Sequence, residues 1–118
     1  MSSFKAFGIA VALMLVASPA LAQHKHVMKM SGPLTASTME FAKANDKMHK
    51  DMAIAYSGNA DVDFVKGMIP HHQGAIDMAK IVIKYGKDPE IKKLAEGIIT
   101  AQESEIAMMK AWLAARPK

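Results

Sequence analysis

The chain has 118 residues, a formal net charge of +4 at pH 7 and no cysteine. Without cysteine, neither disulfide bonds nor thiolate metal ligands are available. Lysines alternate with acidic residues along the chain and aromatic residues are few, which argues against a nucleic-acid partner. Methionine, with eleven residues, is in large excess over an average composition, and this excess calls for an explanation.

Residues 1–22 predict a secretory signal peptide. Lys5 provides a positive start, residues 8–16 an apolar stretch, and residues 20–22 a small-x-small cleavage site. The apolar stretch is shorter than the roughly 20 residues that span a bilayer, so we expect cleavage rather than stable membrane insertion. The sequence therefore predicts a periplasmic or secreted protein that begins near Gln23.

The remaining chain divides into an extended arm, residues 23–36, and a helical bundle domain, residues 37–118. Gly32 and Pro33 and the lack of helical periodicity predict the arm. Ser37 and Glu40 have the spacing of a capping box, which predicts a first helix from there to about Tyr56.

Two further helices are predicted. One begins near Asp61 and ends at Tyr85, with Pro70 either kinking it or restarting it. Gly67 and Gly74 lie on one side of this helix and would allow a neighbouring backbone to approach closely.

The last helix is marked by boundary signals at its start. Gly86 ends the preceding helix, and Asp88 and Pro89 supply a capping residue and a first-turn proline. Apolar residues keep helical spacing from there to the end of the chain. Three helices joined by short turns predict an all-α antiparallel bundle.

The most specific candidate for chemistry is the group Met68, His71 and His72. Their i, i+3 and i+4 spacing brings one thioether and two imidazoles together on a helix. Imidazole suits several transition metals, and thioether shifts the preference toward Cu(I). The alternative is that one histidine is hydrogen-bonded in the core and the other faces solvent.

Methionines on the other helices extend this candidate set. Met48, His49 and Met52 form a similar group on the first helix, and packing beside the second helix would complete a shared site. Met78 lies about 10 Å along the helix from His71, so it would serve a second ion or the core. Met109 carries the same ambiguity, because methionine is also a common core filler.

Glu105 lies on the apolar side of the last helix, together with Gln102. A carboxylate in such a position requires a polar partner. We therefore expect Glu105 either to accept the second N–H of a metal-ligating histidine, which would fix its tautomer, or to reach water at the end of the bundle.

The arm carries His24, His26, Met28 and Met30 at strict i, i+2 spacing, which places them on one side of an extended chain. Such an arm could capture copper and pass it inward, and the amine of Gln23 with His24 could hold Cu(II). The alternative is an arm whose histidines are incidental.

The segment FVKGMIPHHQGAIDMA at residues 64–79, QESEIAMM at 102–109 and Trp112-Leu113 resemble the domain of unknown function 305 family over about residues 39–113. The resemblance implies a ferritin-like, commonly exported bundle, with some members implicated in periplasmic copper binding and resistance and no settled catalytic activity. The chain is short for a full four-helix bundle, so a homodimer could supply the missing surface. By motif position, the resemblance supports Met68, His71, His72 and Met78 most directly, followed by His49, Met52 and Met109.

The combined pattern predicts a copper-binding protein of the periplasm that sequesters or carries copper ions, without catalytic turnover. Cu(I) is favoured and Cu(II) is possible, and another copper-handling protein could receive the ion. A metal-free helical interaction module is the alternative, and a copper-dependent redox enzyme is a less favoured one. A di-iron enzyme is disfavoured, because such bundles use Glu-x-x-His pairs and this sequence has none.

Overall fold

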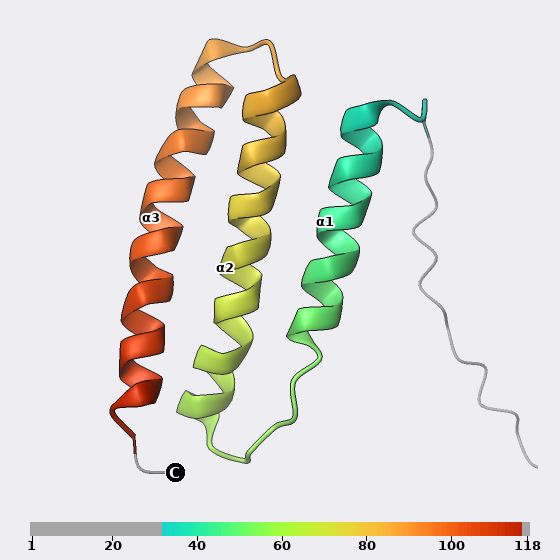
Figure 1. Ribbon diagram of the computed structural model, residues 1–118. Coiled ribbons are helices and arrows are strands. Elements are labelled where there is room, and N and C mark those ends of the chain that lie inside the picture. The colour runs from blue at the N-terminus through green and yellow to red at the C-terminus, as the bar shows by residue number, and fades with distance from the viewer. Residues whose placement is uncertain (1–31, 117–118) are drawn as a thin grey trace, which may run out of the picture.

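The computed structural model describes residues 32–116, which form three α-helices, α1 (Ala36–Met52), α2 (Ala60–Tyr85) and α3 (Pro89–Ala114). Successive helices run in opposite directions (Figure 1). This arrangement confirms the predicted all-α antiparallel fold, and residues 32–116 contain no strand. The predicted signal peptide and most of the predicted arm lie outside the described residues.

The start of α1 differs from the prediction. Thr35, not Ser37, is the capping residue, and its Oγ1 accepts a hydrogen bond from the backbone N–H of Thr38 at 3.1 Å. The predicted capping box between Ser37 and Glu40 is therefore wrong. The hydroxyl that caps the helix belongs to Thr35, two residues before Ser37.

Glu40 instead ties α1 to the end of α2. Its Oε1 accepts hydrogen bonds from Lys84 Nζ at 2.7 Å and from the hydroxyl of Tyr85 at 2.6 Å. These bonds hold the pKa of the Glu40 carboxyl below its usual value, because the Lys84 ammonium and then the Tyr85 hydroxyl stabilise the ionised form.

α1 also ends earlier than predicted, at Met52 rather than near Tyr56. The backbone leaves the helix at Ala53, with ψ of 65°, although the apolar pattern continues. Ile54 then packs against α2, with its Cδ1 3.9 Å from where a side chain on Gly67 would begin. Ile54 therefore lies against α2 from the connecting segment and not from a further turn of α1.

The turn into α2 is fixed by side chains of the new helix. The carboxylate of Asp63 accepts hydrogen bonds from the N–H groups of Ser57 and Gly58 at 2.7 and 3.1 Å. Asn59 caps the helix by accepting from the N–H groups of Asp61 and Val62. These bonds hold the pKa of Asp63 below its usual value, the Ser57 N–H contributing most.

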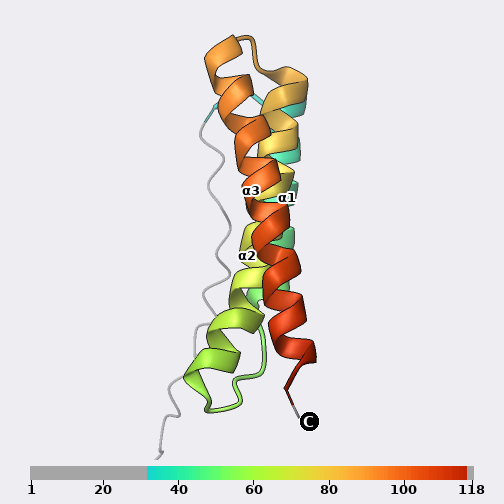
Figure 2. The same cartoon turned by 90° about the vertical axis from the view of Figure 1, so that its left-hand side faces the viewer.

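α2 passes through Pro70 without a break in the helix, so the proline does not restart it. The axis of α2 bends in its lower, green part (Figure 2). A bend is expected there, because Pro70 cannot donate a hydrogen bond to the carbonyl of Lys66. The helix ends at Tyr85 before Gly86, and Asp88 caps α3 with Pro89 in its first turn, as predicted.

Met48 of α1 packs closely against α2 at Gly74. A Cβ atom added to Gly74 would lie 2.5 Å from the sulfur and 3.0 Å from the Cβ of Met48. Gly74 is buried, and only a residue without a side chain leaves room for Met48. The close approach predicted at Gly74 is present, but the neighbour is the side chain of Met48 and not a backbone.

The three helices form a single layer. Within residues 32–116, α2 contacts both α1 and α3, whereas α1 and α3 do not contact each other. The helices lie side by side in Figure 1 and one behind another in Figure 2. The core is correspondingly small, and its centre is Ile76, Ile106 and Met109. No described helix is both long enough and apolar enough to cross a membrane.

Candidate metal centre

A pocket of about 280 Å³ lies between the first half of α2 and the second half of α3. We call it the methionine pocket, because three of its lining residues are methionines. Its remaining lining is mainly aromatic and aliphatic, with one histidine and one carboxylate. The lining residues are Phe64, Val65, Met68, His72, Glu105, Met108, Met109 and Trp112.

Helical spacing and the core together position these side chains. Met68 and His72 are one turn apart on α2, and Glu105 precedes Met109 by one turn on α3. Met109 is buried against Ile76, and Met68 packs against the same cluster. The core therefore holds the inner wall of the pocket in place.

His72 is the polar centre of the methionine pocket. Its Nε2 lies 2.5 Å from Oε2 of Glu105, and its side chain is only 14% exposed. With Nε2–H donating to the carboxylate, Nδ1 carries the free lone pair of the neutral imidazole. The predicted encounter of Glu105 with a histidine is thus present, with His72 as the partner.

The Nδ1 atom of His72 is buried and has no hydrogen-bond partner. Among the described residues, Gln102 Oε1 is the other buried side-chain atom in this condition. A buried polar atom without a partner is costly, and most such atoms in proteins find a partner or a ligand. An imidazole nitrogen and neighbouring thioether sulfur atoms are groups that can bind a transition-metal ion.

Trp112, one of the lining residues, is packed against a cation. The guanidinium of Arg116 lies over the indole ring of Trp112, 3.0 Å from its centroid, and Arg116 also donates to the Trp112 carbonyl. The guanidinium therefore covers one face of the indole ring.

Several predicted site residues lie elsewhere. His71 is exposed and does not line the pocket, although its ring centroid is 6.0 Å from that of His72. Met48 packs over Gly74, His49 is exposed and Met52 is half-buried at the end of α1. The structure thus brings Met68, His72 and Met109 together and leaves the first-helix group apart.

Met78 lines a different pocket, of about 320 Å³, which lies between the second half of α2 and the first half of α3 and is closed on one side by Phe41 of α1. We call it the second apolar pocket. The predicted arm ligands, His24, His26, Met28 and Met30, lie outside the described residues. The full lining of the second apolar pocket is Phe41, Ala75, Met78, Ala79, Val82, Ile91, Leu94, Ala95 and Ile98.

Met108, Trp112 and Phe64 line the methionine pocket but were not among the predicted site residues. Met108 is 64% exposed and follows Glu105 at i+3, the same spacing that singled out Met68 and His71. That spacing was the available signal for Met108, whereas nothing local distinguishes Phe64 from any other apolar residue of α2.

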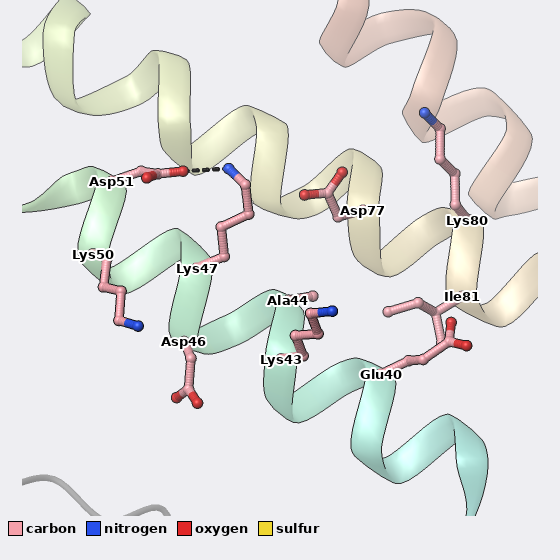
Figure 3. A pocket seen from close by; sticks show the side chains of 10 residues that line it. All are labelled: Glu40, Lys43, Ala44, Asp46, Lys47, Lys50, Asp51, Asp77, Lys80 and Ile81. Carbon is pink, nitrogen blue, oxygen red and sulfur yellow. Dashed lines mark hydrogen bonds and ion pairs between the residues drawn. The ribbon is translucent and has the colours of Figure 1, made fainter.

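A third hollow, of about 710 Å³, lies between α1 and α2 and is charged (Figure 3). Lys47 forms an ion pair with Asp51 across one turn of α1, and Asp77 faces them from α2. Lysines and carboxylates are interleaved over this surface, as expected for a solvated face. Over residues 32–116, no group of three or more histidine, aspartate or glutamate side chains could hold a metal ion.

The fold and the pocket define an all-helical protein whose candidate ligands are mainly sulfur atoms. The chain belongs to the family described as a domain of unknown function (DUF305), whose model matches residues 14–113. An uncharacterized protein of Acanthamoeba polyphaga mimivirus is 47% identical over 53 residues, which cover 45% of this chain and 35% of the viral protein. The match thus spans about a third of that relative's length.

Proposed function

We propose that this protein binds copper outside the cytoplasm and sequesters or carries it, without catalytic turnover. The observation that carries the proposal is the buried, unpartnered Nδ1 of His72 in a pocket lined by three methionines. A signal peptide over residues 1–22 would deliver the protein to the periplasm or the medium. Another copper-handling protein is the proposed donor or recipient of the ion.

The donor set supports Cu(I) as the ion of the methionine pocket. Thioether sulfur and neutral imidazole are donors that Cu(I) accepts, whereas harder ions require carboxylate or water oxygen. The sole carboxylate in the lining, Glu105, is engaged by His72. Cu(II) is better suited to the arm, where the Gln23 amine and His24 supply nitrogen donors.

Each residue of the pocket has a distinct proposed role. His72 Nδ1 and the sulfur atoms of Met68 and Met109 bind the ion, and Met108 is a further donor at the exposed edge. Glu105 fixes the tautomer of His72 and does not bind copper itself. Thioethers suit an oxidising compartment because, unlike thiols, they do not form disulfides.

A competitive titration with a chromophoric Cu(I) chelator tests this assignment. His72→Ala and the double variant Met68→Leu/Met109→Leu should each lose most of the affinity of the wild-type protein. His49→Ala is the matched control, since it removes an imidazole from an exposed position on α1 outside the pocket. Loss of affinity with His49→Ala alone, or no competition by the wild-type protein, would overturn the assignment.

A further inference from the structure

The two apolar pockets open on the same side of the helical layer. Each residue of an α-helix is rotated by about 100° around the helix axis from the one before it. The pocket residues Phe64, Ala75 and Val82 therefore lie within about 20° of one another around the axis of α2. The pocket residues of α3 also keep to one side of that helix. We call the surface formed by the lining residues of these two pockets the apolar face.

The opposite side of the layer is charged. Lys66, Asp77 and Lys84 lie about 200° around α2 from Phe64, and Asp77 lines the charged hollow of Figure 3. In contrast, the lining of the apolar face contains one carboxylate, Glu105, which is bonded to His72. The layer as a whole is amphipathic.

No described helix covers the apolar face. α1 and α3 flank α2 without touching each other, and several large side chains of this face remain open to solvent. Phe64 is 63% exposed, Leu94 59% and Met108 64%. Folded domains bury such a face against a second layer of secondary structure.

We propose that the second layer is a second copy of this chain, packed antiparallel on the apolar face around a two-fold axis near the midpoint of α2. The face is self-complementary in this orientation. The midpoint of Ala60–Tyr85 falls between His72 and Gln73, and Phe64 and Val82 lie at nearly equal distances on either side. The two-fold axis therefore places the protruding Phe64 of each copy over the second apolar pocket of the other.

The same symmetry makes the centre of the interface compact. His71, which is exposed next to the axis, meets the small side chain of Ala75 of the second copy. A parallel arrangement would instead place Phe64 against Phe64 and leave both second apolar pockets unfilled. The macrodipoles of two antiparallel α2 helices also point in opposite directions, which is electrostatically favourable.

The size of the face approaches that of a stable dimer interface. From Phe64 to Val82 the face is about 27 Å long at 1.5 Å per residue, and two packed helices make it about 20 Å wide. The projected area of roughly 500 Å² understates a surface with hollows and protruding side chains. Standard interfaces bury about 800 Å² of accessible surface on each partner, and the wall formed by Phe41 contributes further area.

Sedimentation velocity of the purified, metal-free protein in the presence of a chelator tests the dimer independently of copper binding. The wild-type protein should sediment as a dimer, and Phe64→Glu or Leu94→Glu should raise its dissociation constant by roughly thirtyfold or more, as expected for removing a buried anchor. Both residues are exposed within one chain, so circular dichroism should show unchanged helicity.

Thr100→Glu is the matched control, because it adds the same carboxylate at an exposed site of α3 that lines neither pocket. It should leave the dissociation constant unchanged. A monomeric wild-type protein, a dimer that both glutamate variants retain, or a monomer that cosediments with phospholipid vesicles would overturn the proposal, the last result in favour of a lipid surface as the occupant.

Crosslinking tests the orientation. The chain has no cysteine, so single cysteines report one contact each. A mixture of Phe64→Cys and Val82→Cys chains should form a mixed disulfide under mild oxidation, because a disulfide requires Cα atoms within about 7 Å. Faster crosslinking of Phe64→Cys chains with each other would overturn the antiparallel arrangement.

Discussion

The two ring nitrogens of His72 have different surroundings. Glu105 holds one ring nitrogen, and burial leaves the other without a partner. Spacing within α2 was sufficient to predict that Met68 and His72 share a side of the helix. The contribution of Met109 could not be assigned from the sequence, because it depends on how α3 packs across α2.

Glu105 is proposed as a positioning residue for copper binding. Glu105→Ala should lower the Cu(I) affinity by about 10–100-fold, as is typical when the carboxylate partner of a ligating histidine is removed. Glu105→Gln should recover part of this loss, since the amide oxygen still accepts from Nε2–H. Nitrogen NMR of the His72 ring reports the tautomer, and an equal loss of affinity with Glu103→Ala, an exposed residue of α3, would contradict the role.

Glu40 should make the stability of the folded protein depend on pH in the acid range. Its pKa is lower in the folded protein than its usual value of 4.5, because Lys84 and Tyr85 donate to it. The stabilisation is therefore fully present above pH 4.5 and is lost as the pH falls through the lowered pKa. Urea denaturation should show a steeper loss of stability below pH 4.5 for the wild-type protein than for Glu40→Gln.

Because the Lys84–Glu40 pair lies at the surface, salt should weaken its contribution. Identical pH profiles of the wild-type protein and Glu40→Gln would mean that the ion pair does not hold α1 to α2 in solution.

At the scale of the elements, the contact between α1 and α2 depends on one glycine. Gly74→Ala would place a Cβ atom 2.5 Å from the sulfur of Met48, and the Cβ and Cγ of Met48 are nearly as close. Overpacking of this kind costs about 1–3 kcal/mol, which outweighs the gain of up to about 1 kcal/mol from alanine in a helix. Chemical denaturation should therefore show a net loss of about 1 kcal/mol.

Gly97→Ala provides the comparison. Gly97 lies inside α3, and a Cβ atom there would meet nothing within 4 Å. This substitution should stabilise the protein by about 0.5–1 kcal/mol through helix propensity alone. If both alanine variants changed stability in the same direction, the close packing of Met48 on Gly74 would not be present in solution.

The boundary between α2 and α3 was predictable because local signals set it. Asp88, Pro89 and Gly86 fix their ends through capping and backbone chemistry that is visible in the sequence. The end of α1 was not predictable in this way. The apolar pattern continues past Met52, yet the helix ends there and Ile54 lies against Gly67 of α2, a contact between elements that the pattern does not show.

At the scale of the whole molecule, stability should be uneven across the layer. α1 contains no fully buried residue, and α2 is the one described helix that it contacts, whereas α2 and α3 share the core. Local opening is easiest where few apolar contacts must break. Hydrogen exchange should therefore be fastest in the amides of α1, and slower exchange in α1 than in α2 would contradict this order.

The fold class followed from helical periodicity and short turns, but the openness of the layer did not. Periodicity shows which side of each helix is apolar, not whether the first and third helices meet across the second. The first and third helices stay apart because they pack on nearly opposite sides of α2. α1 contacts α2 at Gly74, and α3 contacts it at Ile76.

Within the part of the chain that the structure describes, contacts between helices join neighbours in the chain. The segments that connect these helices are short, residues 53–59 and 86–88. Chains dominated by such local contacts fold in microseconds to milliseconds. The meeting of two copies is bimolecular, so its rate depends on protein concentration. Refolding should therefore show a rapid phase that is independent of concentration, followed by a slower phase that accelerates as the protein is concentrated.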